Sequence, residues 1–127
     1  MPLSPAVRAE IGAVVGARHV IAEPEQLRVY DCDGLTGWRA TPELVVLPAS
    51  TAEVQAVVRI CAREGIPFVA RGAGTGLSGG ALPVAEGIVV SLARMTRILE
   101  IDLASQRVVA EPGVTNLDIT RAVAAEG

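Results

Sequence analysis

The sequence contains no lysine, a single histidine, and one residue each of tryptophan, tyrosine and phenylalanine among 127 residues. Its 11 basic residues are arginines scattered along the chain, and 14 acidic residues give a formal net charge of −3. The scatter excludes a basic stripe that would follow a nucleic-acid backbone. The scarcity of aromatic rings argues against stacking on bases. We therefore expect no nucleic-acid partner.

Long apolar runs and paired cysteines are also missing. The apolar runs fall far short of the roughly 20 residues that span a bilayer. The start, MPLSPAVRAE, lacks the basic and apolar segments of a secretory signal. Cys32 and Cys61 are not spaced as a CxxC pair, which argues for reduced thiols and against a metal site. These features predict a cytoplasmic protein without a bound metal.

A strand, a helix and a second strand follow one another in the middle of the chain. Residues 44–47 are an apolar run typical of a buried strand. Ser50 and Glu53 have the spacing of a capping box, so we expect a helix from there to Gly65. Residues 66–70 predict the second strand. The sequence therefore predicts a βαβ unit with two parallel strands and a right-handed crossover.

The other segments predict further helices and strands around this unit. The expected fold class is α+β with an α/β-like centre: N-terminal helices, then the βαβ unit and a small mixed sheet. Apolar residues at helical spacing predict the first helix, and alternating or continuous apolar runs predict the strands. The additional elements are helices over 5–16 and 24–30, strands over 88–92, 97–102 and 106–111, and a helix that begins at Thr115.

The segment YDCDGLTGW, residues 30–38, contains two aspartates before a glycine. Its start is faintly similar to a calcium-binding loop, but the glycine at the sixth position and the glutamate at the twelfth are missing, and Pro42 stands at the twelfth. We interpret Asp31–Gly34 as a solvated turn. Cys61 lies on the apolar face of the central helix, so we expect it in the core.

The segment ARGAGTGLSGGALPV, residues 70–84, has five glycines between positions 72 and 80. Its GxGxxG spacing lacks the helix that must follow in a Rossmann site, because Pro83 and Gly87 come too soon. A P-loop would need a lysine. The loop would therefore hold an anion such as a pyrophosphate with its backbone amides alone, as a nest. The alternative is a tight glycine-rich turn without a ligand.

Several motifs occur in a characteristic order along the chain. They are Pro48-x-Ser50-x-x-Glu53-Val54, Arg71-Gly72-Ala73-Gly74-Thr75-Gly76-Leu77-x-Gly79-Gly80, Gly87-Ile88-Val89-Val90, Arg94-Met95, Ile98 and Pro112-Gly113-Val114. Together they resemble the FAD-binding domain of the vanillyl-alcohol oxidase and p-cresol methylhydroxylase superfamily. Within it, the chain is most similar to FAD-linked 2-hydroxy-acid dehydrogenases, such as the flavin subunit of bacterial glycolate oxidase and its D-lactate and D-2-hydroxyglutarate relatives.

The resemblance implies a role for individual residues. The amides of Gly72, Ala73, Gly74, Thr75 and Gly76 would hold the FAD diphosphate, next to Arg71. Gly79, Gly80 and Ala81 would lie along the ribityl chain, and Pro48 with Pro112-Gly113 would border the adenosine. Covalent members of the family carry a histidine where Thr75 stands here, so the resemblance implies dissociable FAD.

The resemblance also sets an expectation for the extent of the domain. It implies an N-terminal helical segment over residues 1–41 and an incomplete first half of the FAD-binding domain over residues 42–127. The whole enzyme would oxidise a small 2-hydroxy acid and pass electrons to an iron–sulfur subunit or a quinone, in the cytoplasm or at the inner membrane through a partner complex. No catalytic residue can be assigned within the 127 residues, and self-association is expected from an uncovered apolar surface.

Three alternatives remain open at this point. The chain could be a nucleotide-binding module without a redox role, or the FAD domain of another reaction class such as a peptidoglycan-precursor reductase. It could also be a non-binding module that serves assembly with a partner chain.

Overall fold

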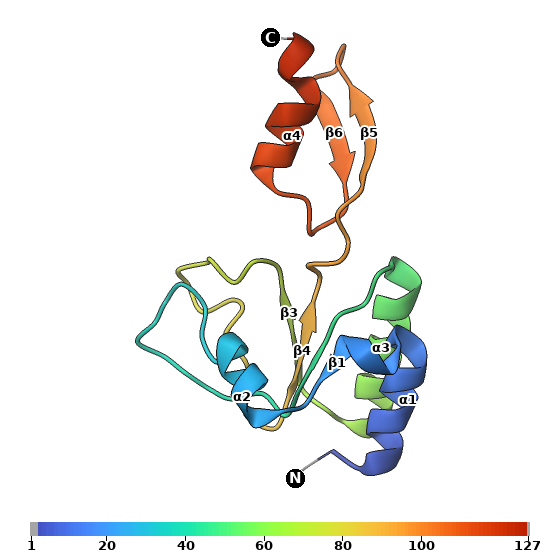
Figure 1. Cartoon of the computed structure of the whole chain (residues 1–127), viewed down its shortest axis with the longest axis vertical. Helices are drawn as coiled ribbons and strands as arrows, with labels where there is room; N and C mark the ends of the chain where they lie inside the picture. Colours follow the sequence, from blue (N-terminus) through green and yellow to red (C-terminus); the bar gives the residue numbers. More distant parts are fainter. Residues whose placement is uncertain (1–2, 127) are drawn as a thin grey trace.

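The computed structural model describes residues 3–126. A larger body contains a four-stranded sheet with helices on both faces, and a smaller unit with a two-stranded hairpin and the C-terminal helix extends from it (Figure 1). In chain order the elements are α1 (Pro5–Val15), η1 (Ala17–His19), β1 (Val20–Ile21), α2 (Pro24–Leu27), η2 (Arg28–Tyr30), β2 (Leu44–Val46), α3 (Thr51–Glu64), β3 (Phe68–Arg71), β4 (Ile88–Ser91), β5 (Ile98–Asp102), β6 (Arg107–Ala110), α4 (Asn116–Val123) and η3 (Ala124–Glu126), where η is a 3-10 helix.

The main sheet has the strand order β1-β2-β4-β3. Strands β2 and β3 are parallel to β4, which lies between them, and β1 is antiparallel to β2. The prediction that the strands flanking the central helix are parallel is therefore confirmed, with a third strand inserted between them. Sequence reasoning missed β1, because its two residues are too short for any pattern to appear.

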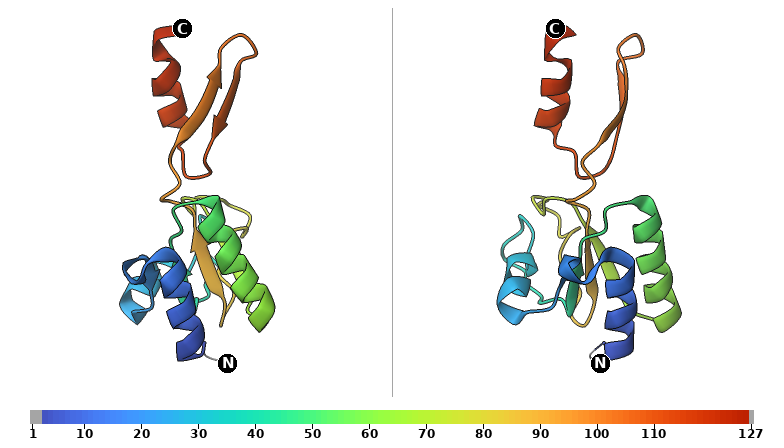
Figure 2. Two further views of the ribbon diagram at one scale, coloured as in Figure 1. Left: turned by 90° about the vertical axis from the view of Figure 1, so that its right-hand side faces the viewer. Right: turned by 45° about the vertical axis from the view of Figure 1, so that its right-hand side comes forward.

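The core lies on both faces of this sheet, because successive strand residues point to opposite sides. Leu44, Val46, Ile88 and Val90 face α1 and α3, and they form one cluster with apolar residues of both helices. Val45 and Val89 form a second cluster with Leu27 of α2 on the opposite face. Figure 2 shows α1 and α3 side by side on one face and α2 on the other. The core thus crosses the division proposed at residue 41, which stays a prediction.

Local signals mark the starts of α1 and α3 and the end of α3. Ser4 accepts a hydrogen bond from the Val7 amide at the start of α1, and Ser50 accepts one from the Glu53 amide at the start of α3. Gly65 ends α3 in the left-handed conformation, with φ of 67°. Cys61 is fully buried on α3, as expected.

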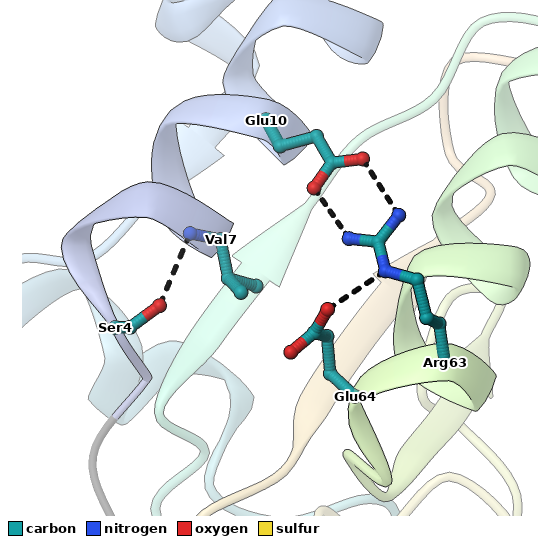
Figure 3. A network of polar contacts seen from close by, with 5 residues as sticks. All are labelled: Ser4, Val7, Glu10, Arg63 and Glu64. Atoms are coloured by element: carbon teal, nitrogen blue, oxygen red, sulfur yellow. Dashed lines mark hydrogen bonds and ion pairs between the residues drawn. The ribbon is translucent and has the colours of Figure 1, made fainter.

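An ion-pair network joins α1 to α3 at the surface. Arg63 of α3 donates hydrogen bonds to both carboxylate oxygens of Glu10 of α1 and to Oε1 of Glu64 (Figure 3). These contacts raise the pKa of the Arg63 guanidinium and lower that of the Glu10 carboxyl. Since the side chains are largely exposed, the apolar contact between the two helices stabilises their packing more than this network does.

Several predicted bounds differ from the observed ones by one or two residues. The helix expected over 24–30 is a short α-helix followed by a 3-10 helix, and the strand expected over 66–70 lies at Phe68–Arg71. The β5–β6 hairpin is antiparallel, with an irregularity in register between Ile98 and Glu100. This irregularity accounts for the imperfect apolar alternation along β5.

The base of the hairpin is closed by Glu111 and Arg97. The Glu111 carboxylate is buried, with 9% of the residue exposed, and accepts hydrogen bonds from the backbone amide, Nε and Nη2 of Arg97. These bonds lower the pKa of Glu111. Because the pKa is lower in the folded state, the stability from this group is present above its unfolded pKa and is lost as the pH falls through its folded pKa.

We expect Glu111→Gln to lower the melting temperature at pH 7, because an amide cannot reproduce the charged pairing with Arg97. The variant should also lose less stability than the native protein when the pH is lowered from about 5 to about 3. Thermal denaturation at several pH values measures both effects. Glu23→Gln, at an exposed position without a side-chain capping bond, is the control. Equal pH profiles for Glu111→Gln and the native protein would contradict the assignment.

Candidate functional site

The expected site residues gather at one edge of the main sheet. Because β2, β3 and β4 are parallel, their carboxyl ends lie together there, followed by Pro48, the glycine loop and Leu92. The amide of Leu92 donates to the carbonyl of Arg71 over 2.8 Å. In open α/β sheets ligands bind outside the carboxyl ends of the strands. The carboxyl-end edge of the sheet, which carries Pro48 and the glycine loop, is therefore a candidate binding site.

The Pro112-Gly113 turn reaches this edge from the hairpin side. The Gly113 amide donates to the carbonyl of Met95 over 2.8 Å. A Cβ atom at residue 113 would lie 2.5 Å from the Leu92 carbonyl oxygen and 2.6 Å from that of Met95. Only glycine allows this close approach, which connects the small unit to the larger body beside the sheet edge.

The glycine loop, defined as residues 72–80, has the conformational features of an open cradle. Gly74 and Gly79 have positive φ angles of 71° and 73°. A Cβ atom at Gly72, Gly76, Gly79 or Gly80 would meet nothing within 4 Å. These four glycines are therefore not required for close packing against other parts of the protein. Their lack of side chains leaves open space beside the loop backbone.

The amides of the glycine loop have no hydrogen-bond acceptor among the residues that the structure describes. Across residues 3–126, none of the backbone N–H groups of residues 72–80 donates a hydrogen bond to a protein acceptor. Unpaired amides that face open space are the donors of an anion-binding nest. The loop therefore fits the diphosphate of a dinucleotide such as FAD, with the amides of Gly72, Ala73, Gly74, Thr75 and Gly76 as candidate donors. The half-buried Gly79 and Ala81 and the exposed Gly80 continue along the same segment.

Arg71 is the last residue of β3 and directly precedes the glycine loop, but its side chain points into the protein. Its Nη1 donates to the carbonyl of Cys32 over 2.7 Å, and its guanidinium lies 5.4 Å from the centre of the Tyr30 ring. Only 8% of the residue is exposed. The guanidinium also lies directly against Gly74, where a Cβ atom would approach it to 2.3–2.7 Å. The predicted role of Arg71 in cofactor binding stays a prediction, and this geometry favours support of the loop from beneath.

The interpretation of Asp31–Gly34 as a solvated turn is wrong for its second half. Asp33 is 4% exposed, its Oδ1 accepts from the Leu35 amide over 2.8 Å, and its Oδ2 is buried without a partner among the described residues. A buried polar atom without a partner costs about 1–3 kcal/mol. Gly34 packs against the glycine loop, near the carbonyl oxygens of Thr75 and Gly76. The Asp-Gly pair in the sequence signals a turn, but nothing in the local sequence indicates its packing partner.

Pro48 is buried where β2 ends, and the neighbouring backbone is held from two sides. The Leu47 amide donates to the carbonyl of His19, and the Leu47 carbonyl accepts from Nη1 of Arg94. His19 is half-buried. Burial, together with the charges of Arg94 and Arg18, lowers the pKa of its imidazole. No cluster of three metal-ligating side chains occurs within residues 3–126.

None of the helices within residues 3–126 combines the length and the apolar composition that crossing a bilayer requires. The two cysteines are free thiols.

A family model and curated relatives both relate this chain to FAD-linked oxidoreductases. A family model described as "FAD binding domain" matches residues 42–127. The glycolate oxidase subunit GlcD of Escherichia coli K12 is 46% identical over 105 residues, covering 83% of this chain and 21% of the relative. The D-lactate dehydrogenase of Archaeoglobus fulgidus is 44% identical over 72 residues, covering 57% of this chain and 16% of the relative. The chain thus spans about a fifth of the length of these curated relatives.

Solved structures agree with the fold over almost the whole chain. The 4-ethylphenol oxidase of Gulosibacter chungangensis superimposes with a TM-score of 0.85 at 30% identity, over 96% of this chain and 24% of that protein. A p-cresol methylhydroxylase with bound substrate superimposes with a TM-score of 0.82 at 28% identity, over 95% and 24%. The chain, with its unpaired amides at the sheet edge, therefore belongs to the family of FAD-binding domains of p-cresol methylhydroxylase type found in FAD-linked oxidoreductases.

Proposed function

We propose that this chain supplies the diphosphate-binding part of an FAD-linked dehydrogenase that oxidises a 2-hydroxy acid such as glycolate or D-lactate. The observation that carries the proposal is the row of unpaired amides over residues 72–80, on a chain 46% identical to a glycolate oxidase subunit. The identity to the D-lactate dehydrogenase of Archaeoglobus fulgidus, together with 30% identity to the D-2-hydroxyglutarate dehydrogenase of Arabidopsis thaliana, supports the same substrate class.

The residues of this chain would bind and orient the cofactor. FAD, when bound, would accept a hydride from the carbon that carries the substrate hydroxyl. The glycine-loop amides would hold the diphosphate, and Pro48 and Pro112-Gly113 would border the same edge. We assign binding and orientation of the cofactor to this segment, and assign no proton transfer to any of its residues.

The proposed partners follow from the same resemblance. The subunit name of GlcD supports a multisubunit enzyme, in which an iron–sulfur subunit would take the electrons. A cytoplasmic location, with contact to the inner membrane only through such a complex, fits the composition of this chain.

The test uses the full-length gene product. The purified protein is expected to show a flavin absorption spectrum and to reduce an artificial dye with glycolate or D-lactate. The panel includes 4-ethylphenol, because the fold is shared with a phenol oxidase. Turnover of 4-ethylphenol but not of 2-hydroxy acids would assign another reaction class. A colourless protein that does not take up added FAD would refute the cofactor assignment.

We also expect the FAD to be dissociable. Thr75 is exposed in the glycine loop, and its hydroxyl cannot form the bond that a histidine makes with a flavin. Acid precipitation of the holoprotein should therefore release the flavin into the supernatant. A pellet that stays yellow after repeated washing would contradict this expectation.

A further inference from the structure

We propose that the turn of residues 31–37, which lies outside the matched FAD-binding region, presets the glycine loop for its anion, with Gly34 and Arg71 as positioning residues. The proposal rests on the proposed function, since the anion is taken to be the FAD diphosphate. It assigns a cofactor-site role to a segment that the family model, which covers residues 42–127, leaves out.

Gly34 lies in close contact with two peptide groups of the glycine loop. A Cβ atom on Gly34 would lie 2.7 Å from the Thr75 carbonyl oxygen and 2.8 Å from the Gly76 carbonyl oxygen. Both oxygens therefore face the turn at a distance that only glycine permits. The side chain of Leu77 closes the contact, with Cδ2 at 3.0 Å from the same Cβ position.

Peptide geometry fixes the direction of the Gly76 and Leu77 amides. In a planar trans peptide the C=O and N–H groups point in opposite directions. Because the carbonyls of Thr75 and Gly76 face the turn, the amides of Gly76 and Leu77 face away from it. Neither amide has a protein acceptor among the described residues, and the space beside Gly76 is open. Two consecutive amides directed to the same open side are the arrangement that binds an anion.

The Arg71 side chain supports the glycine loop from the side of the protein interior; we call this contact the brace. The Arg71 guanidinium is bonded to the Cys32 carbonyl, lies over the Tyr30 ring and lies directly against Gly74. It thereby connects the start of the turn to the middle of the glycine loop. Asp33, between these two contacts, is buried; its Oδ1 accepts from the Leu35 amide within the turn, and its Oδ2 has no partner among the described residues.

The test compares two alanine substitutions in the same turn of the full-length gene product. In Gly34→Ala the new methyl group would overlap both carbonyl oxygens, so the loop must move. In Gly37→Ala it would meet nothing within 4 Å. Neither glycine has a positive φ, so an alanine can adopt either backbone without strain. We expect Kd for FAD to rise about tenfold or more in Gly34→Ala, and to stay at the native value in Gly37→Ala.

The rate of tryptic cleavage after Arg71, measured on the flavin-free proteins, is a readout that does not depend on FAD. Arg71 is buried in the native arrangement, so cleavage after it should be slow. Mass spectrometry should show faster cleavage between residues 71 and 72 in Gly34→Ala than in Gly37→Ala. Arg71→Lys keeps the charge but loses the planar group that bonds Cys32 and lies over Tyr30, and it should weaken FAD binding in the same way. It also serves as the second test if Gly34→Ala fails to fold.

The outcomes separate the two proposals. Failure of the native protein to bind FAD would refute the proposed function, while the cleavage rates would still decide whether the turn braces the loop. Native FAD affinity in both Gly34→Ala and Arg71→Lys would overturn the positioning role. Equal cleavage in the two alanine variants would overturn the brace itself.

Discussion

Replacement of Gly74 by valine is expected to abolish FAD binding while the chain stays folded. Gly74 has a φ of 71°, which a β-branched residue adopts only with strain. Its Cβ would also lie 2.3 Å from Nη2 of Arg71 and 2.4 Å from Cζ. The guanidinium would be displaced from the Cys32 carbonyl, so the loop would lose both its own conformation and its support. The fold should persist, because neither core cluster includes residue 74.

The size of the effect follows from the donors that would be lost. Charge-assisted hydrogen bonds contribute about 1.5–3 kcal/mol each, so the loss of two of them raises Kd for FAD ~100-fold or more. Flavin titration of the full-length variant measures the affinity, and urea denaturation measures the fold. Gly37→Ala, at an open position without positive φ, is the matched control. A folded Gly74→Val variant that binds FAD like the native protein would remove the basis for the nest assignment.

The elements that the sequence predicts correctly are those with strong local signals. Ser50 with Glu53 and Thr115 with Asp118 cap α3 and α4 as their spacing indicates, and the second pair forms a reciprocal capping box. The apolar runs of β2 and β4 are fully buried in the parallel sheet. In each case the physical cause acts within a few residues, so it can be recognised without knowledge of the fold.

The features that the sequence did not reveal depend on contacts between distant segments. Strand β4 lies between β2 and β3 in the sheet. This order depends on pairing between strands that are distant in sequence, so no local pattern predicts it. Asp33 and Gly34 have the composition of a solvated turn, yet Asp33 is buried and Gly34 packs against the glycine loop, some 40 positions away. The contacts of Arg71 with the Cys32 carbonyl and the Tyr30 ring could not be read from the sequence either. The assignment of the glycine loop as the binding site stays a prediction from sequence, whereas the contacts beneath the loop join distant segments and could not be predicted.

The 127-residue chain expressed alone is expected to bind FAD weakly and to show no dehydrogenase activity. A cofactor site typically buries 70–90% or more of its ligand, and the described residues provide one loop at one sheet edge. The residues of the glycine loop are mostly exposed. The diphosphate would therefore have donors on one side only, and the flavin ring would have no enclosing wall within residues 3–126.

The same chain should also self-associate through its small C-terminal unit. Leu99, Ile101, Leu103, Val109 and Leu117 in this unit are each at least 40% exposed, and clustered exposed apolar side chains favour association. Leu117→Glu should reduce the association without unfolding α4, because an acidic residue in the first turn of a helix is favourable. Analytical ultracentrifugation of the native chain and this variant measures the effect.

Titration of the isolated chain with FAD, followed by dye reduction with glycolate and D-lactate, completes the test. We expect no binding tighter than micromolar and no turnover above background. The full-length gene product, assayed in parallel, is the positive control for both readouts. Tight FAD binding together with turnover by a monomeric 127-residue chain would mean that the binding site is complete within it, and that the glycine loop needs no further wall to hold its ligand.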